Sequence, residues 1–217
     1  MIKEIELRKD YLKSNTLDSI YFGGGTPSLL DNTDFTKIFQ TINSQFKLST
    51  DCEITVECNP EDLSIKKLIF LKRIGVNRLS IGIQSFKEED LLFMNRSHNR
   101  KQAIDCIHQA QKIGFTNISI DLIYSLPQQS LEDWKENLDI AFSLDIQHIS
   151  SYSLTIEEKT KLAHLIKNNK IKELEDVESV KHFDLLNKEC IKNNFIGYEI
   201  SNYGKKSYFS KHNSNYW

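Results

Sequence analysis

Residues 101–123, KQAIDCIHQAQKIGFTNISIDLI, contain the pattern that decides the fold. The first half, 101–113, is an amphipathic run that predicts a helix, and Gly114 suits the end of that helix. The second half, Asn117–Ile123, is rich in β-branched residues and predicts a strand. A helix followed by a strand is half of a βα crossover, the unit that joins parallel strands.

The same alternation continues in both directions along the chain. Strands are predicted at Ser19–Phe22, Glu53–Glu57, Arg78–Ile83, Asn117–Ile123, His148–Ser153 and, more weakly, Tyr198–Ile200. Helices are predicted at 32–46, 64–74, 101–113, 131–143 and 177–194. Repeats of roughly 25 to 45 residues favour an α/β fold with a parallel sheet, either an open doubly wound sheet or a barrel.

Several of these strands are nearly continuous apolar runs, as expected where helices cover a sheet. The stretch 161–178 is polar and weakly periodic, which predicts a surface excursion. Without a Pro/Gly/Ser linker or low-complexity segment, we expect residues 1–217 to form one domain.

Composition narrows the classes of function. The chain is 39% hydrophobic and 27% charged, and its 28 basic and 30 acidic side chains are spread evenly, so a nucleic-acid partner is not expected. No stretch approaches the roughly 20 apolar residues of a transmembrane segment, and the N-terminal stretch is too charged for a signal peptide. A cytoplasmic location is therefore predicted. The four cysteines show no CxxC spacing and are expected to be reduced and mostly structural.

Polar residues follow successive predicted strands, where parallel sheets bind ligands. After the first strand, Gly23–Pro27 (GGGTP) offers backbone N–H groups to a ligand, although glycines also serve as plain turn residues. Glu57 ends the second strand and could accept hydrogen bonds from a ligand or end the strand in a salt bridge. Gln84 follows the third strand, where a buried amide needs a partner.

Asp121 lies in the apolar middle of the fourth strand, and a buried carboxylate must be paired or bind a ligand. The fifth strand ends in a polar patch, 150–154, that could equally satisfy backbone groups. Arg96, beyond the third strand, could bind a carboxylate in a bidentate manner or be a solvated arginine at a helix end. Taken together, these positions predict one ligand site.

Four blocks carry a resemblance to a known family: YFGGGTPS (21–28), VECNP (56–60), SIGIQSF (80–86) and DLIYSLP (121–127). In this order they resemble the radical S-adenosylmethionine (SAM) family of oxygen-independent coproporphyrinogen III oxidases and HemW heme chaperones. The resemblance covers essentially the whole chain. It implies a partial (β/α)6 barrel similar to a TIM barrel, missing its first strand.

By this resemblance, Gly24, Gly25 and Thr26 belong to the motif that holds the methionyl amine and carboxylate of SAM. The other positions implied to contact SAM, in the oxidase partly a second SAM molecule, are Glu57, Gln84, Arg96, Asp121 and Ser153. We expect Gly25, Glu57, Gln84, Asp121 and Ser153 to converge on one face of the sheet.

The end of the chain, HNSNYW (212–217), resembles the HNxxYW signature of the chaperone branch. His212 is by resemblance a candidate heme ligand, since imidazole is a common axial ligand. Alternatively, His212 and Trp217 dock the barrel onto a C-terminal domain. The branch implies delivery of heme to heme-accepting proteins.

The sequence departs from the family in one respect. Family members hold a 4Fe-4S cluster with a CxxxCxxC loop after the first strand, and no cysteine here has that spacing. We therefore expect no metal ligands in this chain, a fragment truncated at both ends, and a cluster and heme only in a full-length protein. The alternatives to a heme chaperone are a coproporphyrinogen III oxidase and a scaffold with vestigial pockets.

Overall fold

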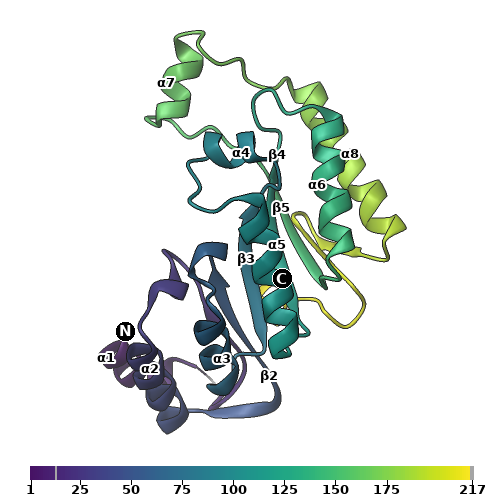
Figure 1. Ribbon diagram of the computed structural model, residues 1–217. Helices are drawn as coiled ribbons and strands as arrows, with labels where there is room; N and C mark the ends of the chain where they lie inside the picture. Colours follow the sequence, from purple (N-terminus) through teal and green to yellow (C-terminus); the bar gives the residue numbers. More distant parts are fainter. Residues whose placement is uncertain (13, 216–217) are drawn as a thin grey trace.

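A computed structural model describes residues 1–12 and 14–215, which form one seven-stranded sheet with helices around it (Figure 1). The strands are β1 (Thr16–Phe22), β2 (Lys47–Cys58), β3 (Arg78–Gln84), β4 (Ile118–Tyr124), β5 (His148–Ser153), β6 (Ile196–Glu199) and β7 (Asn202–Gly204). The five predicted strands that come first in the chain are all present.

The strand order is β1-β2-β3-β4-β5-β7-β6. Strands β1 to β5 pair in parallel, each with the next in sequence, as the βα alternation predicts. The sixth strand is found at Ile196–Glu199 rather than Tyr198–Ile200. It does not pair with β5, because β7 lies between them antiparallel to both. The result is the predicted partial barrel with a hairpin at one edge.

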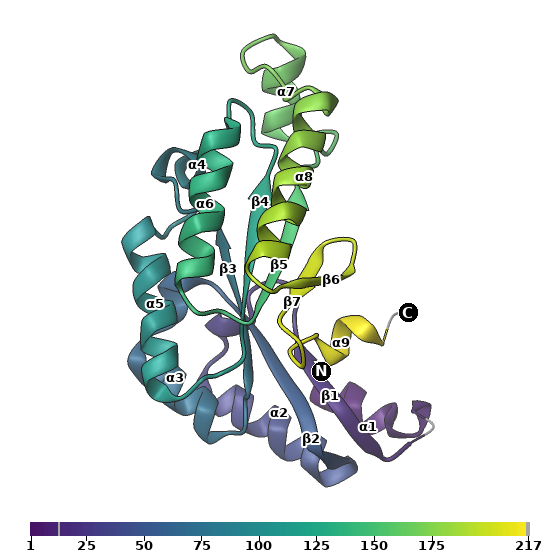
Figure 2. The same cartoon turned by 90° about the vertical axis from the view of Figure 1, so that its right-hand side faces the viewer.

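The long helices return the chain between parallel strands. They are α2 (Asn32–Gln45), α3 (Ile65–Arg73), α5 (Arg100–Ile113), α6 (Leu131–Ser143) and α8 (Asp176–Lys192), all at the predicted positions. Figure 2 shows these helices on the outer face of a strongly twisted sheet. The shorter helices, which the sequence pattern did not indicate, are α1 (Ile2–Leu7), α4 (Glu88–Phe93), α7 (Lys161–Lys167) and α9 (Lys211–Ser214).

Each parallel strand has one apolar and one polar face. Outward-facing side chains such as Leu79, Ile120 and Ile149 are fully buried against the helices, where Trp134 is also fully buried. The inner face instead carries Thr55, Arg78, Ser80, Ser119, His148 and Ser150, which are buried but polar. Two-residue alternation, rather than the predicted continuous apolar runs, therefore describes these strands.

The C-terminal segment covers part of the inner face. Helix α9 packs against β1, at the opposite edge of the sheet from β6 and β7 (Figure 2). The Lys211 ammonium bonds the Asp51 carboxylate at 2.6 Å, and the Ser210 hydroxyl lies 3.4 Å from Glu53 Oε1. These contacts join the two edges and keep the sheet curled.

Among residues 1–12 and 14–215, no helix combines the length and the apolar character needed to cross a bilayer.

Gly114 gives a test of how the βα units are joined. Its φ of 97° is a left-handed conformation, and an added Cβ would meet nothing within 4 Å, so only the backbone opposes a side chain. We expect Gly114→Ala to lower the free energy of unfolding by about 1 kcal/mol. Urea denaturation measures the change, with the exposed Thr116→Ala as control. Unchanged stability would contradict the left-handed helix end.

Candidate functional site

The glycine loop after β1 has backbone conformations that favour glycine. Gly24 and Gly25 have φ values of 76° and 58°, and a Cβ on either would meet no atom within 4 Å. Gly23 is required for a different reason, since a Cβ there would lie 2.9 Å from Glu57 Oε1. Thr26 follows at the start of a short 3-10 turn. The three glycines are exposed, so their backbone is accessible at the end of β1.

Glu57 is oriented by two hydrogen bonds. Tyr21 donates from its hydroxyl to Glu57 Oε1 at 2.6 Å, and the Gly24 N–H donates to Oε2 at 3.1 Å. Burial, and next the bond to Glu57, raise the pKa of the Tyr21 hydroxyl, so it stays a donor. No salt bridge in the described part of the chain involves Glu57. A partly buried carboxylate thus faces the glycine loop without a cation of its own.

Arg96 supplies a positive charge at the ends of β2 and β3. Its Nη2 donates to Asn59 Oδ1 at 2.7 Å and to the Gly82 carbonyl at 3.2 Å, so it is not a solvated arginine. Its Nε is buried and has no hydrogen-bond partner among residues 1–12 and 14–215. A guanidinium held in place with a spare donor is suited to a carboxylate.

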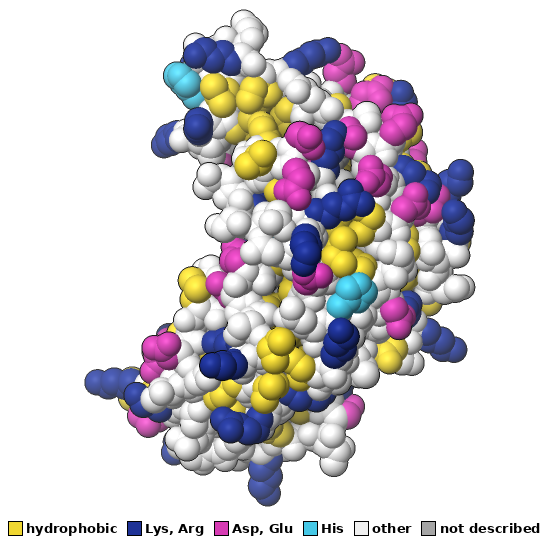
Figure 3. All heavy atoms as spheres, viewed as in Figure 1, with side chains coloured by type: hydrophobic (Ala, Val, Ile, Leu, Met, Phe, Trp, Pro, Cys, Tyr) yellow, Lys and Arg dark blue, Asp and Glu magenta, His cyan; other side chains and the backbone are white. Residues whose placement is uncertain are grey.

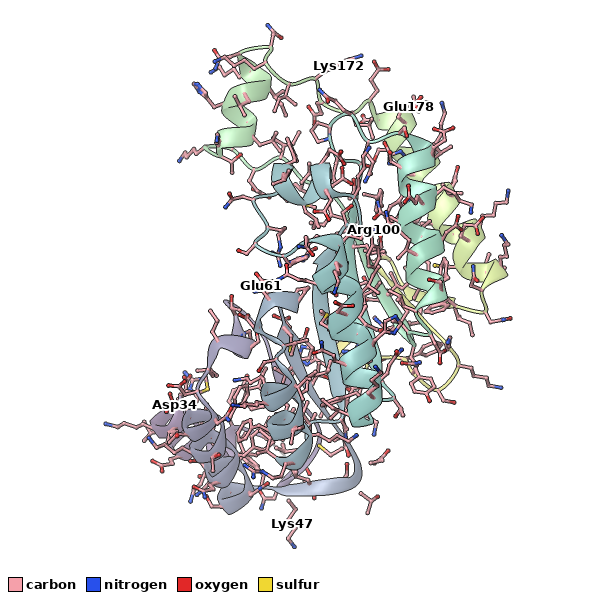
Figure 4. The ribbon with its side chains drawn as sticks, in the orientation of Figure 1. Asp34, Lys47, Glu61, Arg100, Lys172 and Glu178 are labelled. Atoms are coloured by element: carbon pink, nitrogen blue, oxygen red, sulfur yellow. The ribbon has the colours of Figure 1, made fainter. Side chains whose placement is uncertain are left out.

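A bulge in β3 brings Gln84 to the same place. The register shifts between Gly82 and Gln84, and Gln84 has a φ of 66°. A Cβ on Gly82 would lie 2.8 Å from Gln84 Nε2 and 3.5 Å from Arg96 Nη2, so the glycine makes room for both side chains. Glu61, labelled in Figure 4, lies 3.1 Å from Nδ1 of the buried His98, and the other ring nitrogen of His98 lies 3.0 Å from the Ile83 carbonyl.

Asp121 lies on the inner face of β4, beside Gly82 in register. Ser80 donates to its Oδ1 at 3.3 Å. Burial raises the pKa of Asp121 to about 6, although the nearby Arg78 lowers it. The side chain is half-buried rather than enclosed, so a ligand can reach it.

Ser153 lies apart from the other predicted positions. Its register partner is Tyr124, on the helix-facing side of β4, whereas Asp121 pairs with Ser150 on the inner side. The exposed Ser153 hydroxyl is 3.4 Å from Ser179 Oγ on α8. The strand period of two therefore separates it from Asp121, and the predicted convergence on one face does not include Ser153.

His212 contacts the site through Tyr21. The two rings stack at 4.1 Å between centroids and 15° between planes, and the His212 N–H lies 3.4 Å from Glu53 Oε1. Burial lowers the pKa of His212, which favours the neutral imidazole. The remaining signature residues, Tyr216 and Trp217, lie outside the described residues.

A layer of buried polar side chains lies beneath the site on the inner face of the sheet, and the sequence pattern did not lead us to predict it. Arg78 is 2% exposed, and its Nε lies 3.9 Å from Glu53 Oε2. The fully buried His148 lies 2.7 Å from Ser119 Oγ and 2.7 Å from the Tyr198 hydroxyl. The available signal was the alternation of polar and apolar residues within each strand, which places these side chains on one face.

The comparisons with known proteins agree with this architecture. A family model described as the radical SAM superfamily matches residues 2–141. The heme chaperone HemW of Bacillus subtilis is 38% identical over 202 residues, covering 93% of this chain and 53% of the relative. The mitochondrial radical S-adenosyl methionine domain-containing protein 1 of Dictyostelium discoideum is 38% identical, covering 100% of this chain and 52% of the relative.

Among solved structures, the coproporphyrinogen III oxidase HemN of Escherichia coli, described as a radical SAM enzyme, superposes with a TM-score of 0.83 at 23% identity. The match covers 95% of this chain and 47% of that one. The archaeal Elp3 of Methanocaldococcus infernus has a TM-score of 0.68 at 16% identity, covering 87% and 48%. These likenesses show the fold. The chain spans about half the length of the curated relatives it matches.

The buried His148 predicts a dependence of stability on pH. Burial, and next Arg78, hold its pKa well below 6.5 in the folded chain, so the unfolded chain binds more protons below about pH 6.5. Its contribution to the free energy of unfolding should thus fall by about 2 kcal/mol from about pH 7 to about pH 5. Urea denaturation at both pH values should show a smaller loss in His148→Gln. The exposed His108→Gln is the control, and equal losses in all three proteins would refute this role.

Proposed function

The chain belongs to the radical SAM superfamily, and within it we propose that the chain is the SAM-binding part of a heme chaperone that delivers heme to acceptor proteins. SAM binding is supported by two charged side chains near the glycine loop. The Glu57 carboxylate is oriented by Tyr21, and the Arg96 guanidinium is fixed by Asn59. The chaperone part rests on the relatives named heme chaperone and on the HNxxYW signature.

The residues present fit the amino-acid end of SAM. Its ammonium group requires acceptors, which Glu57 offers, and its carboxylate requires donors, which the Arg96 guanidinium and the amides of Gly25 and Thr26 offer. The buried, unpartnered Nε of Arg96 is the observation that favours an anionic group there. Gln84 and Asp121 can bond the ribose hydroxyls or the adenine ring. A contact with Ser153 requires that the ligand extend around the end of β5.

When bound, SAM supplies the adenosyl group that is the source of radical chemistry in this superfamily. The residues of this chain bind and orient it: Tyr21 fixes the Glu57 carboxylate, and Asn59 fixes the Arg96 guanidinium. Orientation of this kind is the contribution that a protein makes to cofactor chemistry.

The described residues do not fit an iron-sulfur cluster. All four cysteines are free and buried, and burial raises the pKa of the Cys106 and Cys190 thiols to about 12. Cluster ligands are thiolates. Within residues 1–12 and 14–215, no group of three or more His, Cys, Asp or Glu side chains is arranged to hold a metal ion.

SAM binding to this chain should depend on the carboxylate geometry. We expect Glu57→Gln to weaken binding about 10- to 100-fold, because it removes a charge-assisted hydrogen bond. Tyr21→Phe should weaken it less, because the carboxylate remains but loses its orienting donor. Isothermal titration with SAM measures both, with the exposed Glu89→Gln as control. Equal affinity in Glu57→Gln and the control would exclude Glu57 from the site.

Heme binding tests the chaperone proposal. Hemin titration followed by optical absorption should show saturable binding, weakened at least about tenfold by His212→Ala but unchanged by the exposed His108→Ala. Absence of saturable binding, or equal binding in both variants, would count against the role of His212 as a heme ligand.

The likeness in fold to HemN favours one second candidate, an oxygen-independent coproporphyrinogen III oxidase. The full-length protein, incubated anaerobically with SAM, a reductant and coproporphyrinogen III, distinguishes the two. Formation of protoporphyrinogen IX would favour the oxidase, and a chaperone should form none.

A further inference from the structure

A groove of about 830 Å³ lies beside the proposed SAM site, at the ends of β3 to β5. Leu92, Phe93 and Met94, at the end of α4 and just after it, line one side. Leu162, Leu165 and Ile171, in and after α7, line the other. Figure 3 shows hydrophobic side chains gathered beneath α7. The volume is within the range of roughly 300–1,000 Å³ typical of small-molecule sites.

The apolar side chains that line the walls of the groove are not packed into the hydrophobic core. Leu92 is 75% exposed and Phe93 is 39% exposed, and none of the side chains of α7 is buried. Contiguous exposed apolar surface of this kind marks a binding site on a folded protein. Helix α7 belongs to the segment that the sequence predicted only as a surface excursion.

The charged groups of the groove are both cationic. Arg96 lies at the inner end, next to Gln84, and Lys161 lies on the α7 side; no carboxylate lines the groove. Lys161 makes no ion pair with any residue among 1–12 and 14–215. The whole segment 159–172 contains five lysines and no acidic residue. Among the described residues, the one of these lysines that forms a salt bridge is Lys172, labelled in Figure 4, which pairs with Glu175.

We propose that this groove binds the macrocycle of a tetrapyrrole, with its apolar ring between α4 and α7 and a carboxylate arm on Lys161. The inference rests on the proposed function, which makes heme the cargo, and adds where the ring is held. Two apolar walls match the faces of a planar ring, and an unpaired ammonium at the rim matches a propionate. The ring would then lie next to the Gln84 and Arg96 end of the SAM site.

The groove and His212 are different parts of the molecule. His212 contacts Tyr21 on β1 and Glu53 on β2, whereas the groove begins at β3 and extends toward α7. A ring held by its apolar faces and its carboxylate needs no iron. Metal-free protoporphyrin IX should therefore bind in the groove and be indifferent to His212→Ala, whereas hemin has in addition an iron that His212 can bind.

The experiment is a fluorescence titration of the chain with protoporphyrin IX, beside the hemin titration. Lys161→Glu reverses the rim charge, and Leu165→Asp places a carboxylate in the apolar wall; both should raise Kd at least about tenfold. Lys167→Glu, on the same helix but outside the groove, and the conservative Lys161→Arg should stay within about twofold. All three positions lie outside the buried core, so the fold is retained; circular dichroism checks this.

The outcomes separate this inference from the proposed function. If hemin binds and responds to His212→Ala but neither porphyrin responds to Lys161→Glu or Leu165→Asp, the groove is not the site and the chaperone proposal stands. If the unaltered chain binds neither porphyrin, both fail. If the groove variants instead abolish sedimentation with anionic lipid vesicles and leave porphyrin binding intact, the groove faces a membrane and the inference is overturned.

Discussion

The structure depends on a guanidinium buried inside the curled sheet. Arg78 is almost fully excluded from solvent, and a charge in such a position is stable only with an internal partner, which Glu53 provides. Around this pair, Ser119, His148 and Tyr198 satisfy one another, and the Tyr198 hydroxyl also accepts from the Ser210 N–H. Burial, and next the charge of Arg78, hold the pKa of His148 well below its usual value, which favours the neutral ring. The layer joins β2, β3 and β5 to the C-terminal segment, and it gives the sheet a polar interior.

The residues proposed to bind SAM lie above this layer because the parallel register fixes their positions along the strands. Glu57 follows Glu53 on the same face of β2, and Gly82 and Asp121 are neighbours one step farther along β3 and β4. The ends of β2 to β4 therefore carry the Glu57 carboxylate, the Asp121 carboxyl group with its raised pKa, and the Arg96 guanidinium bound to Gly82. Tyr21 links the two levels, since it stacks on His212 below and bonds Glu57 above.

Elements with a repeating pattern of apolar residues could be predicted from the sequence, and elements without such a pattern could not. The five long helices and five parallel strands were predictable because amphipathic period and β-branched runs are local signals. Strand β7 has three residues and follows β6 at once, so nothing in its composition separates it from a turn. Helices of four to seven residues, such as α7 and α9, are too short to show a period. The side of the sheet that Ser153 occupies depends on register, and Arg78 reads locally as a strand start, so neither could be assigned without the fold.

The tie between the C-terminal segment and β2 has a consequence for the order of folding. Lys211 and Asp51 are 160 residues apart in the chain, whereas each βα unit is built from near neighbours. Local contacts form early, and contacts across a long loop wait until that loop closes. During synthesis on the ribosome, the strands can therefore assemble one after another while the polar interior stays wet. The ion pair at Arg78 is enclosed only after residues 210–212 reach Glu53 on β2, so closure of the interior follows formation of the parallel strands.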